Sequence, residues 1–494
     1  MKAYITITAI SPPDANEPDY INPTAFLQPD AGAAQVVPGK ACPWLPALAA
    51  AANMRQAMGE ALRTGGGYPL DEGLAMLGTL GLDGLIARLQ QPGPGREALS
   101  TKYIFNYPSC CLMPELIPLE LAGGGWALLD SLGPSFRTID RVACEHAVRP
   151  PEKTLAILFQ ESGDRVFEHI ADAVCERLGA ELSINVYRGG ELANPRRRYD
   201  LLQEIFRRHR AVIFLGHSHE DGGAAGGGWR LTEANENPLL MSELKTFFPP
   251  PQEAASRPRL LRRPRPMAEV VFANCCSSAM GDFAGIHRPA HSYPNLFLGA
   301  GVRFFIATSM KVWWQSPESG SQETQRLLVD FFSRWAAEPD GVIEHLYRAK
   351  YPSLQDEQDR GGLQTRPMFE TATGWVGAGL ALPSPAPAAA LYQVYCPGEP
   401  SEGPGRREPT GAIVSGLARG NWFGRYELLD DAWASPYART FQARKQDGSH
   451  HLVQILADEW QDDPQIGCAL TSAVEHLRKA APAISFRPAP NSRC

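Results

Sequence analysis

The chain has 494 residues, a formal net charge of −7 and ten cysteines. This length is too great for one compact core and predicts roughly three domains. The interspersed charges exclude a global basic surface for nucleic acid, and the scattered cysteines exclude a disulfide-dense scaffold. No apolar run reaches membrane-spanning length, so we expect a cytoplasmic protein with reduced thiols and with neither a membrane nor a nucleic acid as partner.

Residues 1–150 are predicted to form an N-terminal α/β domain whose function the sequence does not indicate. Residues 1–10 have the pattern of a strand rather than of a secretion leader, and helical patterns follow over residues 48–62 and 74–89. The pair Cys110 and Cys111 is interpreted as part of a turn and its core.

From residue 151 to about residue 395, strands alternate with helices. Strands are predicted around residues 154–159, 182–186, 211–217, 268–275 and 302–308, and helices over residues 165–178, 199–208 and 321–336. Strands alternating with helices of this length favour right-handed crossovers. The pattern therefore predicts an α/β fold with a mostly parallel sheet flanked by helices.

Two of these strands stop at residues that can do chemistry. One runs from Ala211 to His217, and the other runs from Ala268 to Cys275. Both are short apolar runs without alternation, which is typical of central strands in a parallel sheet. Functional groups collect at the carboxyl ends of such strands, so we expect His217 and Cys275 to face one another. Taken singly, each residue is more often a packing residue.

A Cys–His dyad is the chemistry that this pair predicts. The thiolate of Cys275 would be the nucleophile, and His217 would stabilise the thiolate and protonate the leaving amine. The backbone N–H groups of Ser218 and Cys275 are placed to stabilise an oxyanion. No third side chain is required by the sequence.

Four motifs, in order, resemble the CHAT domain, a cysteine peptidase module related to caspases and separases. They are Gly216-His217-Ser218, Val270 to Ser277, Leu298 to Ser309, and two closing helices with residues 331–335 and 345–349. The resemblance implies a caspase-like fold and a cysteine endopeptidase, with His217 and Cys275, rather than Cys276, as the catalytic pair. The family has glycine where this chain has Ser218, a change that keeps the backbone N–H.

The resemblance leaves the specificity pocket open. Many relatives carry a Trp-x-Val-x-Asp segment whose acid can bind a basic side chain of the substrate, and the corresponding stretch here is Lys311–Glu318. Asp282 and Glu318 are candidate acids for this pocket, and Trp313 and Trp314 are candidates for an apolar wall. The alternative for each carboxylate is a solvated or helix-capping group.

Two other functions remain open. Residues 216–222 resemble the His-x-His-x-Asp-His signature of zinc hydrolases, with His217, His219 and Asp221 as ligands, but the last histidine is replaced by Gly222. A catalytically inactive CHAT scaffold that binds a partner is the third reading. The leading prediction is an enzyme without a metal or other cofactor, acting on a protein substrate.

The connection over residues 222–266 is longer than an ordinary loop and suggests a lid, a processed segment or a surface insertion. Self-cleavage near Arg257–Arg265 is a hypothesis for this connection. CHAT peptidases are often effectors in defence or cell death, so the resemblance implies regulation, with the flanking domains binding an activating partner.

Residues 396–414 are predicted to be a linker, and residues 415–494 a small α+β domain. This last domain resembles the small lobe of a protein kinase. Active kinases carry a lysine on the third strand, where this chain has Gln454, and residues 430–436 replace the glycine-rich loop. The resemblance therefore implies a non-catalytic module.

Overall fold

The structure is a computed structural model of the 494-residue chain. It describes residues 2–10, 18–28, 35–64, 68–90, 99–105, 108–120, 126–139, 150, 153–219, 228–234, 237–240, 243–244, 267–275, 293–308, 317–351, 379–380, 391–397, 422–423, 426–434, 438–445 and 448–456.

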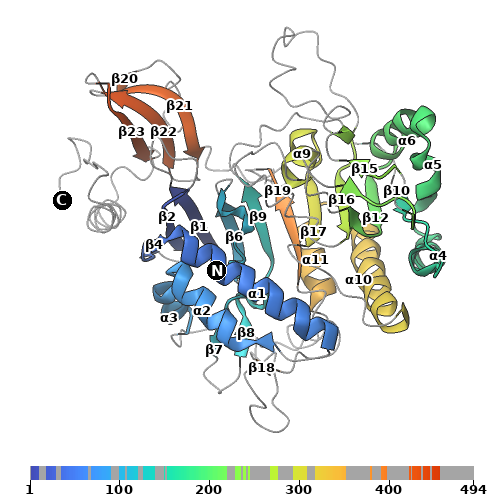
Figure 1. Ribbon diagram of the computed structural model, residues 1–494, viewed down its shortest axis with the longest axis horizontal. Helices are drawn as coiled ribbons and strands as arrows, with labels where there is room; N and C mark the ends of the chain where they lie inside the picture. The colour runs from blue at the N-terminus through green and yellow to red at the C-terminus, as the bar shows by residue number, and fades with distance from the viewer. Residues whose placement is uncertain are drawn as a thin grey trace.

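One mixed sheet of twelve strands crosses the described part of the chain (Figure 1). Its strand order is β11-β10-β12-β16-β17-β19-β9-β6-β1-β2-β3, and β4 pairs with β2 at one side. The strands are β1 (Lys2–Ile10), β2 (Tyr20–Gln28), β3 (Gln35–Pro38), β4 (Cys42–Pro43), β6 (Ser100–Phe105), β9 (Ser135–Ile139), β10 (Thr154–Phe159), β11 (Ser183–Arg188), β12 (Ala211–Leu215), β16 (Val270–Asn274), β17 (Phe304–Thr308) and β19 (Tyr392–Cys396).

The sheet consists of two parallel blocks that run in opposite directions. Strands β11, β10, β12, β16 and β17 form one block, and β19, β9, β6 and β1 form the other. The blocks meet where β17 pairs antiparallel with β19, with Thr308 opposite Tyr392. The carboxyl ends of the first block therefore share an edge of the sheet with the amino ends of β19 and β9.

Helices cover both faces of the first block. One face packs against α4 (Val166–Leu178), α10 (Pro317–Ala337) and α11 (Val342–Lys350). The other packs against α5 (Gly189–Ala193), α6 (Pro195–Arg208) and α9 (Tyr293–Gly299). Helix α4 follows the helical period, since Ile170, Val174 and Leu178 are all buried. The predicted α/β fold, with a large mostly parallel sheet flanked by helices, is confirmed.

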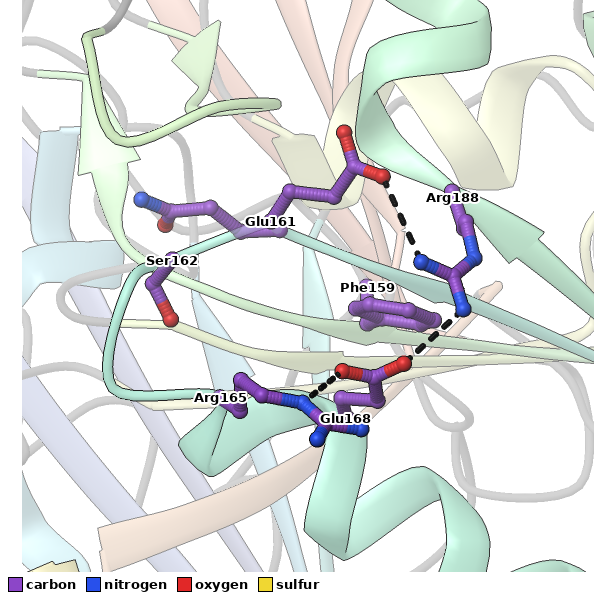
Figure 2. A pocket seen from close by; sticks show the side chains of 7 residues that line it. Phe159, Glu161, Ser162, Arg165, Glu168 and Arg188 are labelled. Atoms are coloured by element: carbon purple, nitrogen blue, oxygen red, sulfur yellow. Dashed lines mark hydrogen bonds and ion pairs between the residues drawn. The ribbon is translucent and has the colours of Figure 1, made fainter.

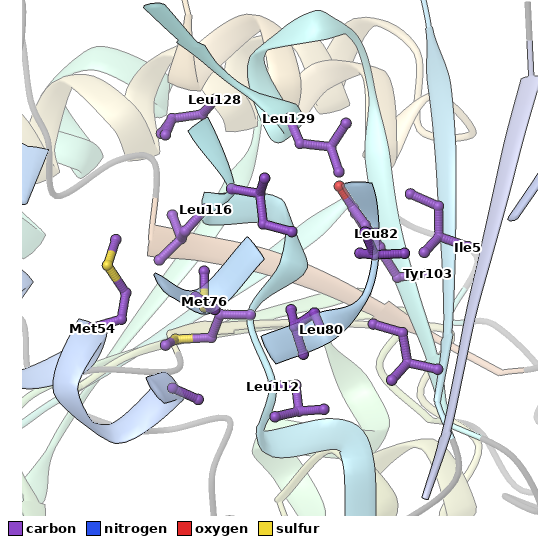
Figure 3. Close-up of a cluster of buried hydrophobic side chains, with 14 of the residues drawn as sticks. Ile5, Met54, Met76, Leu80, Leu82, Tyr103, Leu112, Leu116, Leu128 and Leu129 are labelled. Atoms are coloured by element: carbon purple, nitrogen blue, oxygen red, sulfur yellow. The ribbon is translucent and has the colours of Figure 1, made fainter. Parts of the chain in front are cut away.

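The second block has its own core, built on three helices (Figure 3). These are α1 (Trp44–Thr64), α2 (Leu70–Leu80) and α3 (Asp83–Gln90). The single helix predicted over residues 74–89 is wrong, because Gly81 adopts the left-handed conformation at φ 65° and ends α2. A glycine in this conformation is a common helix terminator.

The large sheet is continuous across the boundary predicted near residue 150. Strand β9 of the first segment pairs in parallel with β19 near the end of the second, through Tyr395 opposite Arg137. The core around α1 and α2 also includes Tyr347, Tyr351 and Leu391 from the second segment. Residues 1–150 thus extend the sheet of residues 151–395.

Short elements complete the described chain. They are the hairpin-like sheets β7 (Pro118–Glu120) with β8 (Trp126–Leu128), β5 (Tyr68–Pro69) with β18 (Gly379–Leu380), and β13 (Ser218–His219), β14 (Gly228–Trp229) and β15 (Leu239–Leu240), together with the 3-10 helices η1 (Pro108–Cys111), η2 (Pro114–Leu116) and η3 (Leu129–Leu132). No helix in the described ranges is long and apolar enough to cross a membrane.

The C-terminal segment forms a separate antiparallel sheet at the periphery of the molecule (Figure 1). Its strands are β20 (Trp422–Phe423), β21 (Tyr426–Ala434), β22 (Ala438–Lys445) and β23 (His450–Leu456). Strand β21 continues through Ala434 with two register shifts, so most of the predicted replacement loop at 430–436 is strand. Gln454 lies on β23, opposite Thr440. The predicted linker beyond residue 397 and the part of the predicted C-terminal domain after residue 456 lie outside the described residues.

Candidate functional site

The two predicted catalytic residues follow adjacent parallel strands at one edge of the sheet. His217 lies two residues beyond the end of β12, and Cys275 comes directly after β16. Leu215 and Asn274 are register partners, and the Gly216 N–H donates to the Asn274 carbonyl at 3.2 Å. The sequence prediction that both residues lie at the carboxyl edge is thus confirmed.

Backbone hydrogen bonds fix the position of His217. Its N–H donates to Oε1 of Gln160, the residue after β10, at 2.8 Å. Its carbonyl accepts the N–H of Arg230 at 3.0 Å. The imidazole lies edge-on to Phe167 of α4, with ring centroids 5.2 Å apart. The ring therefore lies on the face of the sheet that α4 covers.

The environment favours the neutral form of His217. Burial lowers the pKa of the imidazole below its usual value, and the nearby charge of Arg230 lowers it further. The carboxylate of Asp164 opposes this shift. At neutral pH the ring is therefore an acceptor of protons rather than an imidazolium.

Cys275 lies on the other face of the sheet. Its side chain is only 2% exposed and belongs to the core cluster that includes Trp229 and Tyr293. Successive side chains of a strand point to opposite faces of the sheet. Val271 and Ala273 of β16 belong to the same cluster as Cys275, so these three side chains share one face. The contacts of Cys275 are therefore on the α9 face, whereas the ring of His217 contacts α4.

The predicted oxyanion donors lie at the same edge. Because Arg230 N–H bonds to the His217 carbonyl, Ser218 and Trp229 form a non-hydrogen-bonded pair of the β13–β14 ladder. The N–H of Ser218 is then directed away from β14. The Cys275 backbone is fixed at its carbonyl, which accepts the hydroxyl of Thr308 at 3.1 Å.

A small pocket of about 120 Å³ opens at the ends of β10 and β11 (Figure 2). Its charged groups form a chain of ion pairs: Arg165 to Glu168 at 2.6 Å, Arg188 to Glu168 at 2.9 Å, and Arg188 to Glu161 at 3.9 Å. Gln160, which holds the backbone of His217, also lines the pocket.

The strand order of the sheet reverses between β10 and β12, and the pocket lies on the opposite side of β10, next to β11. Strand β11 lies on one side of β10, and β12 lies on the other. In open α/β sheets, ligands bind at the carboxyl ends of the strands beside such a switch point. Sequence reasoning missed this pocket, although the polar run Gln160–Arg165 after a buried strand was a signal for it.

The predicted specificity pocket is not tested, because its residues fall outside what the structure describes. Asp282, Trp313 and Trp314 lie outside the described residues, and Glu318 lies in the first turn of α10 with its side chain undescribed. The same holds for Cys276 and for the candidate cleavage segment Arg257–Arg265.

The alternative zinc site is described in part. His219 lies in β13 next to Ser218, whereas Asp221 lies outside the described residues. Within the described ranges, no three His, Cys, Asp or Glu side chains lie close enough together to hold a metal ion.

No protein-family model matches the chain, and no curated protein matches it.

Proposed function

We propose that this chain is a cysteine endopeptidase of caspase-like fold that resembles CHAT peptidases. Cys275 is the nucleophile, His217 is the general base and acid, and the N–H groups of Ser218 and Cys275 bind the oxyanion. The observation that supports this proposal best is the position of His217 and Cys275 after adjacent parallel strands, next to the switch point of the sheet.

The lowered pKa of His217 sets the order of proton transfers. As a neutral base, His217 takes the proton from the Cys275 thiol while the sulfur attacks the peptide carbonyl. The imidazolium then protonates the leaving amine, which departs as the carbon–nitrogen bond breaks. Water, deprotonated by the same imidazole, hydrolyses the thioester and restores the thiol.

This chemistry requires a change at the end of β16. The thiol of Cys275 is buried on the α9 face, and the ring of His217 lies on the α4 face. A thiol that is 2% exposed does not reach a peptide carbonyl in solvent. The proposed enzyme therefore rests in an inactive arrangement, and activation turns the Cys275 side chain toward the carboxyl edge. An activating partner bound to a flanking segment would supply this change.

The proposed substrate is a protein, and the pocket at the ends of β10 and β11 is the proposed site for one of its side chains. Glu161 and Arg188 at the pocket are each at least a third exposed, so both can exchange their ion pair for a substrate group. The C-terminal sheet, with Gln454 on β23, is proposed to be a non-catalytic regulatory module.

The burial of Cys275 favours one other function, a scaffold without catalysis that binds a protein partner. A peptide library distinguishes the two. Purified wild type, Cys275→Ala, His217→Ala and Cys276→Ala are incubated with the library, with and without a chelator, and products are identified by mass spectrometry. With a cell extract added as a source of activator, we expect cutting that is lost with Cys275→Ala and His217→Ala, kept with Cys276→Ala, and indifferent to chelator.

Other results would point elsewhere. Loss of cutting with chelator would support the zinc hydrolase. No cutting by the wild type, even with a cell extract added as a source of activator, would support the scaffold.

A further inference from the structure

The end of β16 is held by side chains from β17 and β19. The Thr308 hydroxyl donates to the Cys275 carbonyl at 3.1 Å, and the Tyr392 hydroxyl donates to Oδ1 of Asn274. Thr308 and Tyr392 face each other in the antiparallel pair that joins the two blocks of the sheet. Two side chains from one register position thus hold two successive residues, the second of which is Cys275.

Tyr392 is in turn tied to the N-terminal segment. Lys350 at the end of α11 donates to the Tyr392 carbonyl at 2.9 Å and forms an ion pair with Asp130 of η3. Asp130 also accepts the hydroxyl of Tyr351 at 2.8 Å and that of Ser135. We call Asp130, Lys350, Tyr392 and Asn274 the buried relay.

Every member of the buried relay is at most 5% exposed. Asp130 is 1% exposed, Lys350 5%, Tyr392 1% and Asn274 0%. A buried ion pair is often less favourable than apolar residues of the same volume, although removing one partner is costly. Packing alone therefore does not account for these residue types at this position.

Asn274 supports the same conclusion. The Tyr392 hydroxyl fixes its Oδ1, and its Nδ2 has no hydrogen-bond partner among the residues that the structure describes. A buried donor without a partner lowers stability. The amide next to Cys275 is thus kept in a defined orientation at a cost that an apolar side chain would avoid.

We propose that the buried relay positions the end of β16 and couples residues 1–150 to Cys275. Its members are positioning residues and do not touch the substrate. The N-terminal segment thereby sets how deeply the Cys275 thiol is buried. The consequence for catalysis rests on the proposed function, whereas the coupling to the thiol does not.

The test compares two tyrosines of β19 in the full chain. Tyr392→Phe removes the hydrogen bond that this hydroxyl donates to Asn274. Tyr395→Phe, on the same strand β19, removes the hydrogen bond that Arg137 of β9 donates to the Tyr395 hydroxyl. Alkylation of Cys275 by iodoacetamide is followed by mass spectrometry across pH. We expect Cys275 to be alkylated about fivefold faster in Tyr392→Phe than in wild type. The rate for Cys275 in Tyr395→Phe, and that for the partly exposed Cys175 in every variant, should stay unchanged.

A second pair of variants tests the link to the N-terminal segment. Asp130→Asn is expected to speed alkylation as Tyr392→Phe does, and the double variant to add little, because both act through one path. In the activated enzyme, peptide cleavage should fall about tenfold in the same variants, because the loosened thiol is exposed without being aligned with the peptide carbonyl.

Equal alkylation rates in Tyr392→Phe and Tyr395→Phe would overturn the proposal, as would fully additive effects of Asp130→Asn and Tyr392→Phe. Faster alkylation in the relay variants without any cleavage by wild type would support the coupling and contradict the peptidase.

Discussion

At the scale of single residues, His217 and Cys275 show which features of a site can be predicted from the strand pattern of a sequence. The sequence predicted their common edge, because each follows an apolar run of strand length. The further prediction that the two side chains face one another is wrong, because their contacts lie on opposite faces of the sheet. Both strands are buried on each side, so no alternation of polar and apolar residues shows which face a side chain is on. That face follows only from the register between the strands.

His217 carries the first prediction. Because its pKa is lowered in the folded chain, the neutral ring stabilises the fold above the usual value of 6.5, and that stabilisation is lost as pH falls through the lowered pKa. We expect an NMR titration of His217 to give a pKa below 6.5, and Arg230→Gln to move it upward. A pKa above 6.5 would instead indicate an imidazolium paired with a thiolate.

At the scale of elements, strands and helices with a strong apolar pattern were predicted well, whereas the interruption of such a pattern was not. Strand β10 and helix α4 lie within a residue of their predicted bounds. The patterns of α2 and α3 read as one helix, because both are apolar and only the conformation of Gly81 separates them. A glycine in a helical pattern does not reveal from sequence whether it sits within a helix or ends one.

Gly78 and Gly81 give a matched pair of substitutions. A Cβ on Gly81 would lie 2.1 Å from the Lys40 carbonyl oxygen at a φ of +65°, whereas one on Gly78 would meet nothing within 4 Å. We expect Gly81→Ala to lower the free energy of unfolding by about 2 kcal/mol. Gly78→Ala, inside α2, should raise it by about 0.5–1 kcal/mol. Denaturant unfolding measures both, and equal effects would contradict the assigned break between α2 and α3.

At the scale of the whole molecule, the continuous sheet is the feature that the sequence could not show. The start of alternating strands and helices after residue 150 suggested a boundary there. The pairing of β9 with β19 joins residues far apart in the chain and leaves no local pattern. The prediction that residues 1–150 form a separate domain was based on the local pattern of strands and helices, whereas strand pairing depends on long-range contacts.

Truncation tests this continuity. A chain that begins at residue 151 loses β9 and the core around Tyr347, Tyr351 and Leu391. It also exposes the edge of β19, so we expect it to aggregate or to lack a cooperative thermal transition. A chain that ends at residue 397 keeps the large sheet and should melt as the full chain does. A folded, soluble chain from residue 151 would contradict the integrated sheet.

The catalytic pair is the central claim, and labelling by a pool of peptidyl acyloxymethyl ketones tests it most directly. These probes bind a cysteine covalently once a peptide occupies the site. With the cell extract added as a source of activator, tryptic mapping should find the label on Cys275 of the wild type and of Cys276→Ala, and should find it strongly reduced on Cys275 of His217→Ala. Label that does not depend on His217, or that lies on another cysteine, would contradict the dyad.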